Sequence, residues 1–374
     1  MAPAESKLLL TDRAISSSNH VPSNYIRPVG DRPNLLDVES STSVPLIDLH
    51  GLLGPARSDV IKEIGSACRT DGFFMVKNHG IPEEVVREML RVAREFFHLP
   101  EAERLKCYSD DPSRTTRLST SFNVRTEKVS NWRDFLRLHC YPLEDFIREW
   151  PCNPPDFKQV VGEYSKHARA LAVRLLEGIS ESLGLERDHM VKAMGKQAQH
   201  MAINYYPPCP QPELTYGLPG HKDPNAITVL LPDGVSGLQV LRGQKWVAVE
   251  PVPNALIINM GDQIQASNMD MNSLHQTFVP FCNESNTNKA FLSVLSNDRY
   301  KSVLHRVIVN NKSERISVPT FYCPSPDAVI EPAEALVDDD HPLRYRSFTY
   351  GEYYEKFWNR ELLSASCLDL FKAS

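Results

Sequence analysis

The chain has 374 residues, of which 41% are hydrophobic and 24% are charged, and its net charge at pH 7 is −6. This charge argues against the basic surface that nucleic acids and anionic membranes bind, so a small molecule or another protein is the expected partner. We find neither a secretory signal nor an apolar run of ~20 residues. The eight cysteines form no C-x-x-C pair, so we expect reduced thiols in a cytoplasmic protein.

The first part of the chain alternates strands and helices after a polar start. Residues 1–42 are rich in Ser, Asn and Pro, and we expect them to form a flexible lead-in. The elements that apolar spacing predicts next are strands at 44–49 and 72–80 and helices at 58–70 and 82–100. Ser58 or Asp59 is the expected N-cap of the first helix. These elements predict an N-terminal domain of mixed α and β structure over residues 43–150.

One long helix dominates the next part of the chain. Residues 101–131 are polar and irregular, and no regular element is expected there. Leu171 and Leu175 belong to an apolar stripe that predicts an amphipathic helix over 164–185. Residues 151–197 are therefore expected to form helices that cover a sheet.

Beyond residue 198 the sequence changes to short strands separated by Gly, Pro and Asn. The seven β-rich runs lie at 200–206, 226–231, 237–243, 245–252, 255–261, 305–310 and 315–323. Such a series is typical of an all-β barrel or sandwich, which we expect over residues 198–330. Residues 331–374 are expected to form a helical segment. Residues 266–293 interrupt the series, because they show no period of 2 or 3.6 residues, and this is unusual in a compact domain.

Two polar residues precede the apolar run at 226–231. Side chains at positions i and i+2 of a strand share a face, so His221 and Asp223 are expected to project together. His305 is flanked by alternating apolar residues and is expected to face inward on another strand. Two imidazoles and one carboxylate on one face of an octahedron suit non-haem Fe(II) oxygen chemistry. An H-x-D pair alone is common at surfaces and caps, so the assignment depends on His305 and on the residues beyond it in the chain.

A candidate anion site lies C-terminal to His305. Arg315 and Ser317 are two positions apart on the next predicted strand and share one face. A guanidinium binds a carboxylate through two hydrogen bonds, and a hydroxyl adds a third donor. Tyr206, at the end of its strand, could donate its hydroxyl to the same ligand, although a rigid Pro-rich turn with aromatic packing explains this residue equally well. A hydrolytic zinc site would provide no carboxylate ligand for Arg315 and Ser317 to bind.

These motifs carry a family resemblance. H-K-D at 221–223, His305, R-I-S at 315–317 and N-Y-Y-P at 204–207 together resemble the plant 2-oxoglutarate- and Fe(II)-dependent dioxygenases. The resemblance runs from about residue 20 to residue 372. It implies a mixed α+β protein with a distorted double-stranded β-helix (jelly-roll) core, a helical cover and an N-terminal α/β domain.

The resemblance also implies a role for each motif residue. Fe(II) would be bound by His221, Asp223 and His305. The residues expected to bind 2-oxoglutarate are Arg315, Ser317, Tyr206 and Asn204. O₂ is the expected second co-substrate, ascorbate the expected reductant, and the protein is expected to be a monomer that acts on a small phenolic molecule.

Longer motifs narrow the resemblance to the downy-mildew-resistance oxygenases of plants, through "NWRDFLRLHCYPLE" and "FWNRELLSASCLDLFKAS". Those enzymes hydroxylate salicylic acid, and some members act on flavanones. The expected reaction is therefore 3- or 5-hydroxylation of salicylic acid in plant defence, and the alternative is a flavanone oxygenase. The resemblance places Phe135, Arg137 and Phe321 in the substrate pocket. We hypothesise that Arg137 pairs with a small acidic phenolic; the alternative is an ordinary surface arginine.

The chain departs from the family at residues 266–293. In relatives, the strand ending "GDQIQ" leads almost directly into "LSNDRYKSVLHR", and here 28 residues intervene. The composition and edges of the segment resemble a retained intron read in frame or a gene-model error, and a genuine loop is the alternative. A folded, non-catalytic binding protein is therefore a third interpretation of the chain. His275, within the segment, is not expected to be a metal ligand.

Overall fold

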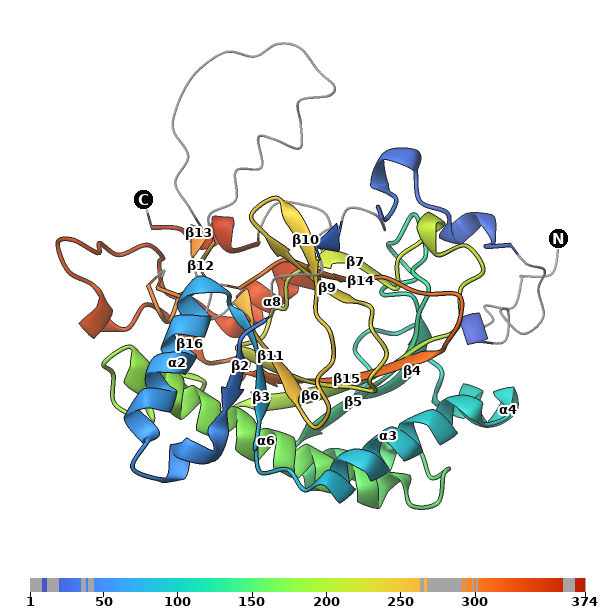
Figure 1. Cartoon of the computed structure of the whole chain (residues 1–374), viewed down its shortest axis with the longest axis horizontal. Coiled ribbons are helices and arrows are strands. Elements are labelled where there is room, and N and C mark those ends of the chain that lie inside the picture. The colour runs from blue at the N-terminus through green and yellow to red at the C-terminus, as the bar shows by residue number, and fades with distance from the viewer. Residues whose placement is uncertain are drawn as a thin grey trace, which may run out of the picture.

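Two facing β-sheets, with helices packed on the outer side of the larger one, form the body of the protein (Figure 1). The computed structural model describes residues 9–11, 20–34, 38–39, 44–262, 266–267, 291–292, 294–297, 299–300, 302–358 and 367–373. The predicted class, a mixed α+β protein with a jelly-roll core, is confirmed.

The larger sheet has eight strands and the smaller has five. In spatial order the larger sheet consists of β2 (Leu46–Asp48), β3 (Phe73–Lys77), β11 (Leu256–Met260), β8 (Ile227–Pro232), β15 (Arg315–Cys323), β6 (Ala198–Tyr206), β5 (Asp134–Tyr141) and β4 (Thr116–Thr120). The smaller sheet consists of β1 (Val38–Glu39), β10 (Lys245–Ala248), β9 (Leu238–Arg242), β14 (His305–Val307) and β7 (Leu218–His221). Two further strand pairs are β12 (Ala266–Ser267) with β13 (Phe291–Leu292), and β16 (Val329–Ile330) with β17 (Phe348–Thr349).

The long helix α6 (Phe157–Ser182) lies against the outer face of β8 and β15 and beside two other helices (Figure 1). The remaining helices are α2 (Arg57–Thr70), α3 (Glu83–His98), α4 (Glu101–Arg104), α5 (Leu143–Phe146), α7 (His189–Ala193) and α8 (Tyr350–Trp358). None of the helices in the described ranges combines the length and the apolar character needed to cross a bilayer.

Strand β6 shows how the sequence separates the two faces of the larger sheet. Met201, Ile203 and Tyr205 belong to the hydrophobic core beneath the helices. Asn204 and Tyr206 alternate with them and point into the space between the sheets. Because β6 is covered on both faces, it lacks the exposed polar face of an ordinary antiparallel strand.

Several predicted boundaries need correction. Residues 101–131 are not irregular throughout, because they contain the short helix α4 as well as β4. Neither Ser58 nor Asp59 caps α2, since Val60 N already donates to Ala56 O at 3.2 Å and places the cap at Ala56. Helix α6 begins before the predicted residue 164, because the buried Phe157 extends its apolar stripe by two turns. Strand β5 was not predicted, and β7 ends at His221 instead of continuing to Asp223.

Part of the predicted lead-in packs on the body of the protein. The backbone N–H groups of Leu10 and Thr11 donate to the buried Asp134 carboxylate at 3.0 and 2.8 Å. The ring of Tyr25 meets Trp132 edge to face, with 5.4 Å between the ring centroids. The described residues near the N-terminus are thus tied to β5, which also forms part of the wall between the two sheets.

A hydrogen-bond cluster joins residues that precede and follow the segment 266–293 in the sequence. The hydroxyl of Tyr353 on α8 donates to Asp262 at 2.7 Å, and Ser302 Oγ donates to the same carboxylate at 3.4 Å. Strands β12 and β13 pair antiparallel, with Ala266 opposite Leu292. Residues 268–290 of the predicted insertion, including His275, lie outside the described residues.

Candidate active site

A cavity of about 150 Å³ between the two sheets is lined by all ten side chains that the sequence assigned to a site. They are Phe135, Arg137, Asn204, Tyr206, His221, Asp223, His305, Arg315, Ser317 and Phe321. Strands of both sheets contribute them, so residues far apart in sequence meet at one place.

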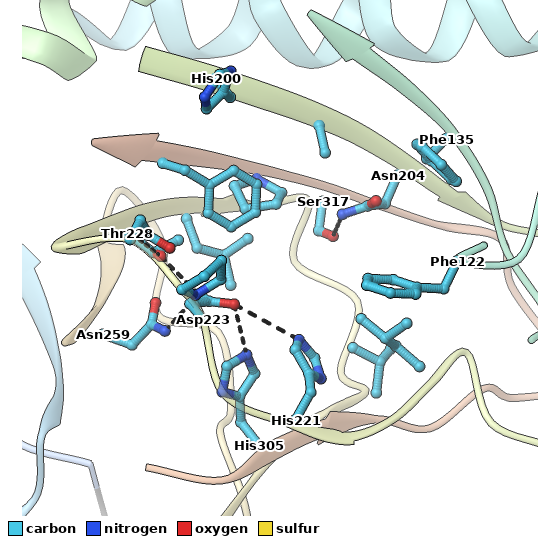
Figure 2. A pocket seen from close by; sticks show the side chains of 18 of the residues that line it. Phe122, Phe135, His200, Asn204, His221, Asp223, Thr228, Asn259, His305 and Ser317 are labelled. Atoms are coloured by element: carbon cyan, nitrogen blue, oxygen red, sulfur yellow. Dashed lines mark hydrogen bonds and ion pairs between the residues drawn. The ribbon is translucent and has the colours of Figure 1, made fainter. Parts of the chain in front are cut away.

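His221, Asp223 and His305 form the cluster that could hold a metal (Figure 2). His221 ends β7 and lies directly opposite His305 of β14 in the antiparallel register. The distances from Asp223 Oδ1 to the Nε2 atoms of His221 and His305 are 3.8 and 3.7 Å. The prediction that one strand aligns the first two residues is wrong in detail: β7 ends at His221, and the loop leading to β8 turns Asp223 toward the histidines.

Hydrogen bonds fix the orientation of all three side chains. The Nδ1 atoms of His221 and His305 lie 2.9 and 3.1 Å from the carbonyl oxygens of Pro219 and Val303. A carbonyl only accepts, so each Nδ1 carries the proton and each Nε2 presents a lone pair to the cluster. Asp223 Oδ2 accepts hydrogen bonds from Thr228 and Asn259 at 2.7 and 2.8 Å, as Figure 2 shows, which leaves Oδ1 facing the imidazoles.

The electrostatics of the cluster favour metal binding. Burial, followed by the nearby His305, lowers the pKa of His221 to about 3, so its imidazole is neutral at pH 7. Burial alone would raise the pKa of Asp223, but the two histidines and the hydrogen bonds from Asn259 and Thr228 outweigh it and lower that pKa. A neutral His221 imidazole thus lies beside an ionised carboxylate, and with His305 these residues form the two-histidine, one-carboxylate donor set of the non-haem iron facial triad.

Arg315, Ser317 and Asn204 form a polar group on neighbouring strands. Arg315 Nε donates to Val235 O at 3.0 Å, while its buried Nη1 has no hydrogen-bond partner among the described residues. Asn204 Nδ2 donates to Ser317 Oγ at 3.2 Å (Figure 2). The Arg315 guanidinium also lies 5.2 Å from the centre of the Tyr206 ring. A buried donor without a partner is costly, and a carboxylate from a bound ligand would satisfy it.

These residues therefore fit Fe(II) and 2-oxoglutarate on their own chemistry. The His221, Asp223 and His305 donor atoms lie within 4.8 Å of one another, close enough to share one ion. Arg315 supplies an unpaired cationic donor on the same cavity wall. A metal site beside a carboxylate anchor is what a 2-oxoglutarate-dependent reaction requires.

The predicted pocket residues also reach the cavity. Phe135 lies under two guanidinium groups, with Arg133 Cζ at 4.4 Å and Arg117 Cζ at 5.2 Å from its ring centre. Arg137 is not a surface arginine, because it lines the cavity and donates to Arg114 O at 3.0 Å. Phe321 lies opposite His200 of β6 in the sheet register.

Sequence reasoning missed several residues of the same cavity. They are Arg117, Phe122, Arg133, Thr228, Asn259, Tyr350, Tyr354 and Phe357. The alternation in "TRLST" at 116–120 is a strand signal that would have placed Arg117 on one face. The three residues of α8 carry no such signal, since only the tertiary fold brings this C-terminal helix to the cavity.

Comparisons with known proteins agree with this geometry. Residues 197–324 match the family model of the 2OG-Fe(II) oxygenase superfamily, and residues 44–157 match the model described as non-haem dioxygenase in morphine synthesis N-terminal. The chain is 59% identical to Protein DMR6-LIKE OXYGENASE 1 of Arabidopsis thaliana, over 99% of this chain and 98% of that protein. It is 49% identical to Flavanone 3-dioxygenase 2 of Oryza sativa subsp. japonica, over 99% of each chain.

A solved structure, JOX2 in complex with 2OG, Fe and JA, is similar over 99% of each chain, with a TM-score of 0.82 and 33% identity. Two full-length relatives, two family models and one solved structure thus indicate the same family. The chain belongs to the 2OG-Fe(II) oxygenase superfamily and is a 2-oxoglutarate-dependent dioxygenase that uses Fe(II), 2-oxoglutarate and O₂.

Proposed function

We propose that this dioxygenase hydroxylates a small phenolic acid, with salicylic acid as the substrate that fits best. The lining of the cavity carries the proposal, because it combines aromatic side chains with arginines that suit an acid. Phe122, Phe135 and Phe321 line it, and aromatic walls suit an aromatic ring.

In the proposed reaction each group of residues has a separate task. Fe(II) would be held by His221, Asp223 and His305, and with 2-oxoglutarate it supplies the chemistry that activates O₂ and oxidises the substrate. Arg315 and Ser317 would hold the distal carboxylate of 2-oxoglutarate, assisted by Tyr206 and Asn204. The phenylalanines would orient the phenolic ring and exclude water from the reacting atoms.

The division of the chain into domains is also part of the proposal. We place the N-terminal domain at residues 43–150, the covering helices at 151–197 and the catalytic core at 198–330. The matches to the family models at 44–157 and 197–324 support this division. The remaining parts of this division are the lead-in of residues 1–42 and the C-terminal segment of residues 331–374.

A flavanone oxygenase is the second candidate. The 49% identity to a protein named Flavanone 3-dioxygenase 2, over 99% of each chain, favours it. A flavanone carries no carboxylate, however, so the arginines of the cavity wall would face a neutral substrate. The phenolic acid is therefore the first choice.

Product analysis separates the two candidates. The purified chain is incubated with Fe(II), 2-oxoglutarate, ascorbate and either salicylate or naringenin, and succinate and hydroxylated product are quantified together. We expect succinate and hydroxysalicylate in equal amounts, and a loss of both in His305→Ala. The control His341→Ala, at an exposed histidine, should keep both.

Two other results of the product analysis would change the proposal. Coupled turnover of naringenin but not of salicylate would replace the first candidate by the second. A lack of coupled succinate formation with either compound would contradict both candidates.

A further inference from the structure

Two arginines face each other across neighbouring strands on the cavity wall. Arg117 of β4 and Arg137 of β5 are direct partners in the antiparallel register. Both line the cavity, so both side chains lie on the same face of the sheet. Like charges placed directly opposite each other destabilise a sheet, so the pair requires an explanation.

The cavity wall around this pair carries an excess of positive charge. Arg117, Arg133, Arg137 and Arg315 all line it, and Asp223 is the only carboxylate among the described residues that do so. Arg117 is 3% exposed. Burial, followed by the charges of Arg137 and Arg133, lowers its pKa to about 10, so it remains a cation at neutral pH. The carboxylate of Asp111 acts on the pKa of Arg117 and of Arg137 in the opposite direction and offsets part of their charge, but it also accepts hydrogen bonds from Ser113. A buried cation that is only partly compensated is expensive.

The protein satisfies only part of the hydrogen-bonding capacity of these groups. Arg137 Nη2 donates to the carbonyl oxygens of Pro112 and Arg114, which ties down the turn before β4. The Nε atoms of Arg117 and Arg137 are both buried and have no hydrogen-bond partner among the described residues. Carbonyl oxygens accept hydrogen bonds from a guanidinium but do not neutralise its charge. A structural role for Arg137 therefore explains the turn, and Asp111 compensates only part of the paired positive charge.

The neighbours of the pair leave space beside it. Arg137 lies opposite Ala202 of β6, whose methyl group is the smallest side chain in this part of the wall. Phe135 lies on the same face, two residues before Arg137. His200 lies two residues before Ala202 and directly opposite Phe321. The space over Ala202 is thus flanked by two phenylalanines and closed at one end by guanidinium groups.

We propose that Arg117 and Arg137 together bind the carboxylate of the substrate, with the aromatic ring over Ala202 between Phe135 and Phe321. Strand β5 lies three steps from β8 in the sheet order, which is ~14 Å at a spacing of ~4.8 Å per strand. Asp223 is hydrogen-bonded to Thr228 of β8. A carboxylate held at β4 and β5 therefore directs the opposite edge of the ring toward the metal ligands.

The proposal rests on the proposed function in that the cavity is taken to be the substrate site, and it defines the substrate class as an aromatic carboxylate. Arg315, on a separate part of the wall, would bind 2-oxoglutarate. The two anions are thereby recognised by different arginines, and a neutral phenol of the same shape should bind more weakly.

The test compares an acid with its neutral isostere. Dissociation constants of salicylate and salicylamide are measured by calorimetry with the anaerobic holoenzyme, loaded with Fe(II) and 2-oxoglutarate. We expect the wild type to bind salicylate at least about tenfold more tightly than salicylamide, because a charged hydrogen-bonding partner is worth about tenfold or more. Arg117→Met and Arg137→Met should each abolish most of this preference by weakening salicylate binding alone. The exposed control Arg148→Met should retain it.

Thermal unfolding provides a second readout that does not depend on turnover. Removing one of two opposed cations should leave the Tm of the ligand-free Arg117→Met variant equal to or above that of the wild type. The rise in Tm that saturating salicylate causes in the wild type should disappear in this variant. A variant that fails to fold is recognised by a lowered Tm, and the test then relies on Arg117→Gln, which keeps a polar side chain without the charge.

The outcomes separate this inference from the proposed function. Turnover of salicylate with an unchanged preference for the acid in both arginine variants would overturn the carboxylate site and leave the reaction standing. An arginine-dependent preference for salicylate without turnover would support the site and show that the true substrate is another aromatic acid. Equal binding of salicylate and salicylamide by the wild type would overturn the inference outright.

Discussion

Thr228 donates a 2.7 Å hydrogen bond to Oδ2 of Asp223, while Oδ1 of the same carboxylate lies nearest to His221 and His305. Asn259 donates to the same Oδ2 at 2.8 Å. The carboxylate is thus held from behind by two donors, and only one of its oxygens is free to bind a metal. Partners of this kind orient a ligand and tune its affinity for the ion.

Thr228→Val should therefore weaken metal binding. The substitution keeps the shape of the side chain and removes the donor, and the loss of such a partner typically costs 10–100-fold in metal affinity. The affinity is measured by anaerobic titration with Fe(II), or with Co(II) as a spectroscopic substitute. Thr228→Ser restores a hydroxyl and should recover most of the affinity. Equal affinities in the Val and Ser variants would show that the hydrogen bond has no part in orienting Asp223.

Arg315 should dominate the affinity for 2-oxoglutarate. Arg315→Leu removes a two-pronged donor from a buried site, and we expect the Kd for 2-oxoglutarate to rise at least ~100-fold, since each charged hydrogen bond contributes ~1.5–3 kcal/mol. Ser317→Ala should raise it by only ~10-fold. Arg315→Lys keeps the charge but loses the planar fork, so it should recover only part of the affinity. The exposed Arg346→Leu is the control, and a Kd that Arg315→Leu leaves unchanged would place 2-oxoglutarate elsewhere.

A histidine pair on the pocket side of β5 and β6 should make stability sensitive to acid. His139 and His200 lie with 4.2 Å between ring centroids. Burial, followed by the nearby Arg137, lowers the pKa of His139 to about 4, and burial holds the pKa of His200 well below its usual value. An unfolded histidine titrates near 6.5, so between pH 6.5 and 4 the unfolded state binds more protons than the folded one.

The free energy of unfolding should consequently fall as the pH is lowered through this window. His139 alone accounts for up to ~3 kcal/mol of the decrease at pH 4, since one unit of pKa corresponds to ~1.4 kcal/mol. Urea unfolding of the wild type and of His139→Gln is measured from pH 7 to pH 4. The variant should show a shallower decrease, and the exposed control His341→Gln should follow the wild type. Parallel curves for the wild type and His139→Gln would contradict the prediction.

The segment between β12 and β13 should be replaceable without loss of activity. Ser267 lies directly opposite Phe291, which is the register that a two-residue hairpin connection requires. Replacing residues 268–290 by Asn-Gly should raise the stability by at most ~2 kcal/mol, because each halving of a loop contributes only ~0.6 kcal/mol. The expected kcat and KM for salicylate lie within about threefold of those of the full chain. A large gain in activity on replacement would instead support the interpretation in which the segment disables the enzyme.

The sequence predicted which side chains meet in the cavity better than it predicted the elements that carry them. His221, Asp223, His305, Arg315 and Ser317 were all assigned from their spacing and from a family resemblance, and the structure brings them to one cavity. The prediction that a single strand aligns the first two was wrong, because a loop after β7 provides the turn. Residue spacing carries chemical information even where the local backbone differs from the regular element that was assumed.

The remaining wall of the cavity was harder to predict because it is defined by pairing between distant segments. Arg117 lies in a stretch that appeared irregular, and its meaning depends on the register that places it opposite Arg137. Tyr350, Tyr354 and Phe357 belong to a C-terminal helix whose amphipathic pattern does not specify its partner. Local patterns predict elements, and contacts over such separations arise only when the core is assembled.

The hydrogen bond from Ser302 to Asp262 has a practical consequence for engineering. It draws together the chain before and after the segment bounded by β12 and β13, and Tyr353 braces the same carboxylate from α8. These bonds connect the two sides of the segment through described residues alone. A folded reporter domain with neighbouring termini, inserted between β12 and β13, should therefore leave the shape of the cavity unchanged. Such a fusion offers a way to follow the enzyme in a living cell without modifying either terminus.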